Sequence, residues 1–71
     1  MNWQQHDELQ QLTLEAEDRL RGGEGRSGTH YELMNLIGKY GLTAMTREEA
    51  VEKGQRLCDE FIASQLAEEA A

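Results

Sequence analysis

The stretch THYELMNLIGKYGLTAMTREEA, residues 29–50, contains two helix start signals with a helix stop signal between them. Thr29 and Glu32 have the spacing of a capping box, in which a hydroxyl and a carboxylate bind unpaired backbone N–H groups at a helix start. Gly41 is suited to the left-handed conformation that often ends a helix. The first half of the stretch therefore predicts a helix over about 30–40.

The second half of the stretch repeats the start signal. Thr46 and Glu49 have the same capping-box spacing, and Met45 and Ala50 are placed to form a hydrophobic staple across the helix start. Apolar residues then recur at helical spacing, with charged residues between them. We expect a third helix over about 47–67.

Upstream of the stretch, the sequence predicts a first helix over about 3–21. Its apolar residues are spaced three and four apart, as on one helical face: Leu9, Leu12, Ala16 and Leu20. Leu14 lies off that face. Asn2 is suited to cap the start of this helix, and Gly22 is suited to end it.

The glycine-rich connector over 22–28 superficially resembles a phosphate-binding loop. A Walker motif needs a lysine after its second conserved glycine and a strand before the loop. Thr29 stands at the lysine position, and a helix is expected to precede the loop. We therefore interpret 22–28 as a flexible connector.

These signals predict an all-α fold, a small three-helix bundle that forms one domain over 1–71. A chain of 71 residues buries only about 60% of its unfolded surface, and its single cysteine, Cys58, rules out an internal disulfide. We expect homodimerisation to complete the bundle. Gly38 and Gly54 lie inside predicted helices, where each is expected to mark a close approach of two backbones.

The expected helix over 30–40 is apolar around most of its circumference, so it belongs in the core or in an interface. We assign five apolar residues to the core or to self-association: Tyr31, Met34, Ile37, Tyr40 and Phe61.

The net charge of −7 disfavours direct binding to nucleic acids and to anionic lipid surfaces. The chain has no run of about 20 apolar residues and no signal-peptide pattern, so we expect a cytoplasmic protein that does not contact membranes. We find no metal-ligand spacing, cofactor motif or catalytic constellation. The chain is therefore expected to be neither an enzyme nor a cofactor-binding protein.

Acidic residues recur at helical spacing in the third predicted helix, and we assign four of them to a partner-binding face: Glu48, Glu49, Glu52 and Asp59. Such a row is suited to a basic groove, including one that normally holds nucleic acid. Two observations also fit the simpler interpretation that these acidic residues only keep the chain soluble. Pairs such as Glu52 with Arg56 neutralise part of the row, and surface charge often serves solubility.

In size, acidity and helical pattern, the chain is similar to accessory proteins of bacteriophages and other mobile elements, including inhibitors of host defence. This resemblance implies a protein-binding module that modulates or inhibits a larger partner by occupying its surface. One alternative is a small dimeric helix-turn-helix-like DNA-binding regulator, and another is a virion assembly protein.

Overall fold

The computed structural model describes residues 1–22 and 29–70, and within them all regular structure is helical. The helices are α1 (Trp3–Leu20), α2 (Thr29–Gly38) and α3 (Arg47–Ala70). The prediction of an all-α fold is confirmed. The predicted connector over 22–28 lies outside the described residues except for Gly22.

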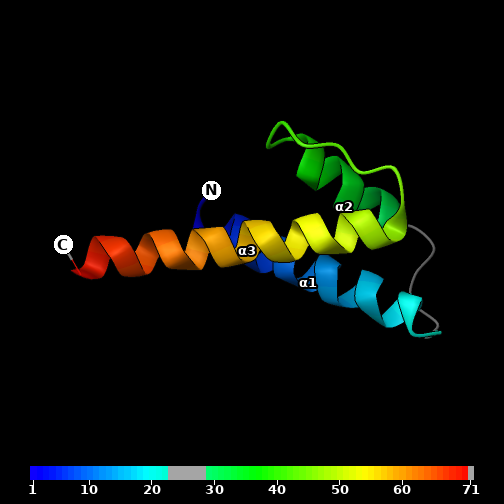
Figure 1. Cartoon of the computed structure of the whole chain (residues 1–71), viewed down its shortest axis with the longest axis horizontal. Helices are drawn as coiled ribbons and strands as arrows, with labels where there is room; N and C mark the ends of the chain where they lie inside the picture. The colour runs from blue at the N-terminus through cyan, green and yellow to red at the C-terminus, as the bar shows by residue number, and fades with distance from the viewer. Residues whose placement is uncertain (23–28, 71) are drawn as a thin grey trace.

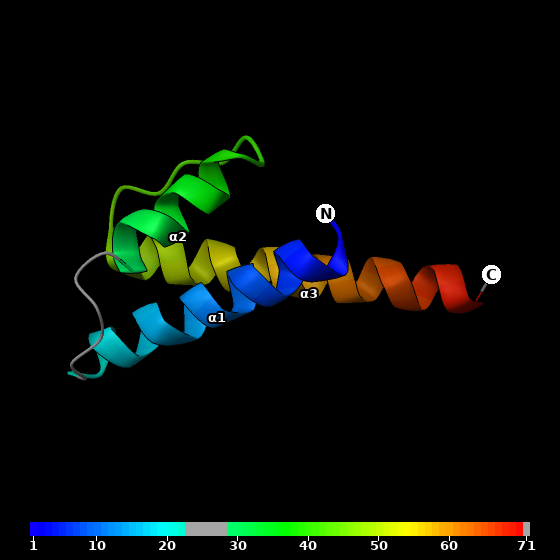
Figure 2. The same cartoon turned by 180° about the vertical axis from the view of Figure 1, so that it is seen from behind.

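The helices pack against one another in all three pairs. α1 and α3 run in opposite directions, and α2 lies across one side of this pair (Figures 1 and 2). α3 is the longest helix, and its C-terminal part extends beyond the start of α1. The molecule is consequently elongated, with dimensions of 42 × 22 × 18 Å.

Two of the predicted helix-end signals act as expected in α1. The Asn2 side chain accepts a hydrogen bond from the Gln5 backbone N–H at 2.8 Å, and the Gln5 side chain accepts one from the Asn2 N–H at 3.0 Å. The return bond from Gln5 completes a capping box that the sequence analysis did not anticipate. Gly22 follows the helix with φ at +91°, a conformation that favours glycine.

The ends of α2 and α3 differ slightly from prediction. α2 ends at Gly38, and Gly41, with φ at +79°, lies in the turn that follows rather than directly at the helix end. α3 begins at Arg47 as expected but continues to Ala70, past the predicted end near 67. Its last residues are mostly alanine and glutamate, which have high helix propensity.

The start of α3 is fixed by a hydrogen-bonded network. Thr46 Oγ1 accepts from the Glu49 N–H at 3.1 Å, and Glu49 Oε2 accepts from the Met45 N–H at 3.1 Å. The carboxylate thus reaches one residue further back than in a standard capping box. Lys53 Nζ lies 3.0 Å from Glu49 Oε1 and also donates to the Thr43 carbonyl. This network attaches the connection at 39–46 to the first turns of α3.

The predicted staple between Met45 and Ala50 is wrong, because the Met45 side chain is 83% exposed. Ala44, one residue earlier, is buried instead. A turn that directs Ala44 inward leaves Met45 in solvent.

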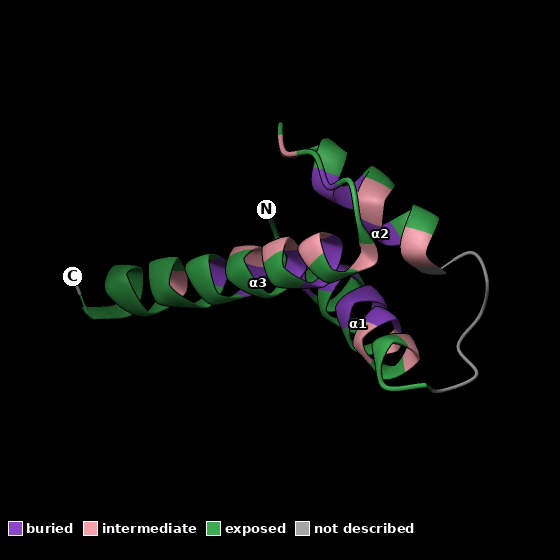
Figure 3. Ribbon diagram, turned by 45° about the vertical axis from the view of Figure 1, so that its right-hand side comes forward, coloured by how far each residue is buried: buried purple, intermediate pink, exposed green. Residues whose placement is uncertain are grey.

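The core lies where the three helices meet, and the C-terminal part of α3 outside it is mostly exposed (Figure 3). Its largest fully buried side chains are those of Leu9, Leu33 and Ile37. The smaller residues Ala16 and Ala50 are also fully buried and let the helices approach closely. Burial of a leucine or isoleucine side chain stabilises a fold by about 1.5–3 kcal/mol, so each of the three large side chains contributes substantially to the stability of the core.

Gly54 on α3 marks the closest approach in this core. A Cβ atom at this position would lie 2.4 Å from Thr13 Oγ1 of α1 and 3.4 Å from a methyl group of Leu33 on α2. Thr13 is buried, and its hydroxyl donates to the Leu9 carbonyl at 2.7 Å. The close approach predicted at Gly54 is therefore confirmed. The same prediction for Gly38 is wrong, because a Cβ there would have no neighbour within 4 Å.

We expect Gly54→Ala to lower the free energy of unfolding by about 1–3 kcal/mol, the usual cost of overpacking a core. The added methyl group either separates α1 from α3 or displaces the Thr13 hydroxyl from its hydrogen bond. Urea denaturation followed by circular dichroism measures this change.

The matched control is Gly38→Ala, which places the same methyl group in open space. It should leave stability unchanged or raise it by about 0.4–1 kcal/mol. In the Gly54→Ala background, Thr13→Ala removes the clashing oxygen and should recover part of the loss. Equal effects of alanine at the two glycine positions would contradict this account of the core.

Candidate functional site

The four acidic residues assigned to a partner-binding face have two different environments. Glu49 and Glu52 are engaged within the chain, by Lys53 at 3.0 Å and by Arg56 at 3.4 Å. Glu48 and Asp59 are exposed and have no ion-pair partner among the described residues. The predicted pair of Glu52 with Arg56 is confirmed, and Glu48 and Asp59 carry the charge that is not offset locally.

Glu49 is better explained by its part in the helix cap. The hydrogen bond from the Met45 N–H, followed by the contact with Lys53, lowers the pKa of the Glu49 carboxyl below its ordinary value. This carboxylate fixes the connection before α3, so we remove it from the residues available to a partner.

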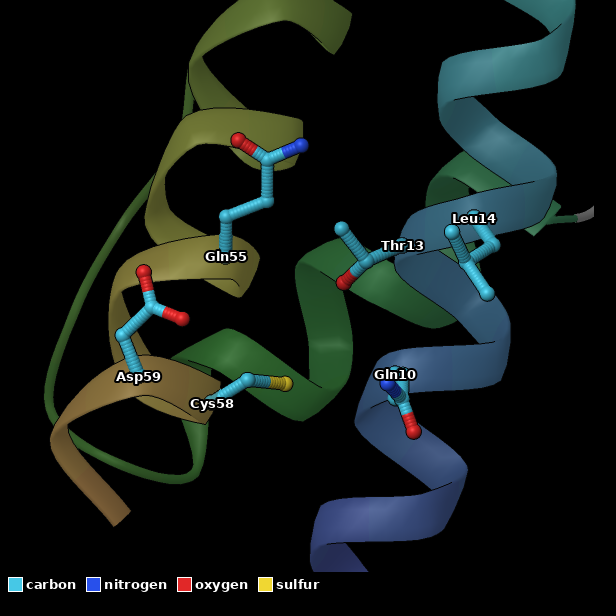
Figure 4. A pocket seen from close by; sticks show the side chains of 6 residues that line it. All are labelled: Gln10, Thr13, Leu14, Gln55, Cys58 and Asp59. Carbon is cyan, nitrogen blue, oxygen red and sulfur yellow. The ribbon is translucent and has the colours of Figure 1, made fainter. Parts of the chain in front are cut away.

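Asp59 lies at the mouth of a groove between α1 and α3. The groove has a volume of about 240 Å³ and opens on the side of the helix pair opposite α2 (Figure 4). Its lining comes equally from the two helices: Gln10, Thr13 and Leu14 from α1, and Gln55, Cys58 and Asp59 from α3.

Cys58 forms a buried part of the groove lining. Burial raises the pKa of its thiol, and the neighbouring Asp59 carboxylate adds to the rise. The thiol is therefore protonated at neutral pH and contributes an apolar surface rather than a nucleophile.

Exposed residues continue from the groove along one side of α3, with spacings of four and three residues. We call this row the α3 stripe: Glu48, Glu52, Gln55, Asp59, Ile62 and Leu66. Residues at this spacing lie on the same side of a helix. The stripe is acidic from Glu48 to Asp59, apart from the neutral Gln55, and it ends in the two apolar residues Ile62 and Leu66.

The apolar end of this surface was not predicted from the sequence. Leu66 is 60% exposed, Ile62 is 38% exposed, and Leu14, which lines the groove from α1, is 56% exposed. The alternate spacing of four and three from Glu48 to Leu66 was the signal that would have found the stripe.

The five residues assigned to the core or to self-association do not form one surface. Ile37 lies in the core, and Phe61 is buried beneath Trp3, with ring centroids 4.8 Å apart. Met34 and Tyr40 are partly buried against the core. Tyr31 is 69% exposed, which leaves it as the member of the set most available to a partner.

His6 joins Trp3 and Phe61 in an aromatic cluster between α1 and α3. Its ring lies 5.4 Å from Trp3 and 5.3 Å from Phe61, and its Nδ1 lies 3.3 Å from Asp7 Oδ1. The ring is buried, and Nε2 has no hydrogen-bond partner among the described residues. The cluster holds the start of α1 against α3.

A second groove lies between α1 and α2, and Lys39, which precedes Tyr40 in the sequence, is one of its lining residues. Burial raises the pKa of the Tyr40 hydroxyl, and the Glu8 carboxylate adds to this effect. The groove has a volume of about 340 Å³, and its rim carries the carboxylates of Glu8 and Glu32 together with the Lys39 ammonium. Because both signs of charge are present, this rim does not select a ligand by charge.

Among residues 1–22 and 29–70, no group of three or more histidine, cysteine or acidic side chains is arranged to hold a metal ion. None of the described helices combines the length and apolar character needed to cross a membrane. Comparison with protein-family models, curated proteins and solved structures gave no match. The function must therefore be inferred from the surface itself.

The lowered pKa of Glu49 predicts an acid-sensitive helix cap. A carboxyl with a depressed folded-state pKa contributes stability above its ordinary value of 4.5, and the contribution is lost as the pH falls through the folded-state value. We expect Glu49→Gln to destabilise the chain at pH 7, and the difference from wild type to shrink as the pH falls below 4.5. Urea midpoints measured between pH 7 and pH 3 test this.

Glu48→Gln is the matched control, because Glu48 is adjacent, exposed and without an ion pair in the described chain. It should shift the urea midpoint little at any of these pH values. A stability difference between wild type and Glu49→Gln that stays constant down to pH 3 would refute the proposed role of the carboxylate.

Proposed function

We propose that this chain is a small acidic protein-binding module that acts in the cytoplasm by occupying a basic surface of a larger partner. Binding there modulates or inhibits the partner, and a groove that normally holds nucleic acid is a suitable target. The observation that carries the proposal is the pair Glu48 and Asp59, which lie on one side of α3 with no ion pair in the described chain.

The charge distribution supports a basic partner. From Leu57 to the end of the sequence there is no lysine, arginine or histidine, whereas Asp59, Glu60, Glu68 and Glu69 are acidic. An unbalanced row of carboxylates on a rigid helix attracts a positive surface over long range and accelerates association. Such a row also presents negative charge at repeated intervals, as a nucleic acid backbone does.

The resemblance to phage and mobile-element accessory proteins favours an inhibitor among such modules, because these small proteins act by covering a surface rather than by catalysis. We therefore propose binding, without an enzymatic step, as the mode of action.

The alternative of a DNA-binding regulator is less favoured. The connection from α2 to α3 at 39–46 is longer than the turn of about three or four residues in a helix-turn-helix. The start of α3, which would approach the DNA, carries Glu48 and Glu49. Negative charge at that end opposes contact with phosphates. No feature of the described surface favours a virion assembly protein.

We also propose that the chain forms a homodimer through α2. Tyr31 is largely exposed on α2, Met34 on the same helix is partly exposed, and Tyr40 is partly exposed in the turn that follows it. A second copy packed on these residues would add apolar burial that so small a chain otherwise lacks.

The homodimer predicts a light-scattering mass of twice 8.1 kDa at micromolar concentration. Tyr31→Ala should shift the equilibrium toward monomer by removing the exposed ring. A mass of 8.1 kDa together with a cooperative thermal transition would show that the monomer is the stable unit, contrary to this proposal.

The partner-binding proposal predicts that combined Glu48→Lys and Asp59→Lys weaken binding by about tenfold at low salt. The partner is first isolated from host cytosol by affinity capture and identified by mass spectrometry, and dissociation constants are then measured with the purified protein. Wild-type affinity should fall as salt concentration rises.

Glu32→Lys serves as the matched charge control, since Glu32 is exposed on α2, away from the α3 stripe. It should change affinity much less than the double substitution. Equal losses from both variants, or an affinity independent of salt, would argue against a specific acidic face.

A further inference from the structure

The groove between α1 and α3 has an exposed apolar side chain, Leu14, on one wall and an acidic side chain, Asp59, on the other. α2 covers one side of the α1–α3 pair, and the groove opens on the other side (Figure 4). The exposed Leu14 lies on its α1 wall, and Gln55 and Asp59 of the α3 stripe line its other wall, from which the stripe continues in both directions along α3. Helices pack by placing side chains into such grooves between rows spaced three and four residues apart.

We propose that this groove binds a single amphipathic helix of the partner, basic in one half and apolar in the other. The inference rests on the proposed function and specifies how the acidic face engages its target. We call the surface the docking face and define it by Leu14, Glu48, Asp59, Ile62 and Leu66.

The apolar half of the docking face lies toward the C-terminal end of α3. Ile62 and Leu66 are one turn apart and exposed, and they follow Phe61, whose ring contacts Trp3 at the start of α1. The C-terminal part of α3 extends beyond the start of α1 (Figures 1 and 2). The described chain leaves this part of the helix mostly uncovered (Figure 3). Leucine or isoleucine residues of a partner helix, spaced three or four apart, would bury these side chains.

The acidic half of the docking face specifies the charge of the occupant. Glu48 lies at the start of α3, and Asp59 lies at the groove. Lysine or arginine residues in the corresponding half of the partner helix would complement them. An antiparallel occupant would therefore carry its apolar residues first and its basic residues last.

Charge also argues against a second copy as the occupant. The net charge of each chain is −7, and two copies joined through this face would bring acidic stripes together. In an antiparallel arrangement, the acidic half of one α3 would instead lie against the apolar half of the other. Both arrangements leave carboxylates uncompensated, which costs affinity.

To test this proposal, the ¹⁵N-labelled full chain is titrated with two synthetic helical peptides of about 18 residues and identical composition. The patterned peptide places leucines in one half and lysines in the other half of a single helical stripe, and the scrambled peptide distributes them around the helix. We expect the patterned peptide to bind at least tenfold more tightly. Its amide shift changes should map to 10–14 and 48–66.

Leu66→Gln should weaken binding of the patterned peptide by about tenfold. Met45→Gln is the matched control, because Met45 is even more exposed than Leu66 but lies in the connection before α3. It should leave the affinity unchanged. Should Leu66→Gln fail to fold, the comparison of the two peptides on the wild-type chain still decides the question.

Equal binding of both peptides would contradict the proposed binding of a partner helix in the groove. It would not contradict the proposed acidic protein-binding module. Absence of binding by either peptide at low salt would contradict the proposed binding of a partner helix and also remove the electrostatic basis of the proposed function. Self-association that Leu66→Gln abolishes would overturn the inference in favour of a second copy.

Discussion

The packing of this small chain depends on the missing side chain at Gly54, where α3 lies close enough to α1 and α2 for a Cβ to collide with Thr13. Glycine inside a helix costs about 0.5–1 kcal/mol relative to alanine, so the position is favourable only because it permits close contact. This close contact is accompanied by complete burial of Leu9 on α1 and Leu33 on α2, the two helices that pack against α3. The Thr13 hydroxyl tolerates burial because it donates to the Leu9 carbonyl of its own helix.

The same arrangement divides the surface into two unlike faces. Because α2 covers one side of the α1–α3 pair, the opposite side keeps a groove with Leu14 on one wall and Asp59 on the other. One carboxylate near the start of α3 is not available to a partner, because Glu49 accepts a hydrogen bond from the Met45 N–H and forms an ion pair with Lys53. The remaining carboxylates and the exposed Ile62 and Leu66 then form one continuous stripe, from which we infer a basic, amphipathic partner.

Local signals predicted the helices well because helix starts and stops depend on residues close in sequence. Asn2 and Thr46 act as caps, and Gly22 adopts the predicted left-handed conformation. The prediction of a Met45 staple was wrong because Ala44, rather than Met45, packs into the core before α3. A capping pattern depends on nearby residues and carries no information on such a tertiary contact. The candidate site was predicted in part: Glu48 and Asp59 remain available, whereas Glu49 serves the cap.

The sequence by itself determined the helical class, the approximate helix ends and the excess of negative charge, because each follows from neighbouring residues or from composition. Only the tertiary structure distinguished Gly54 from Gly38, since both stand inside predicted helices and only Gly54 lies close against another helix. It also decided that Leu14, Cys58 and Asp59 share a groove and that Leu66 stays exposed. Helical periodicity fixes which residues share a side, but only packing between distant segments decides which side is covered.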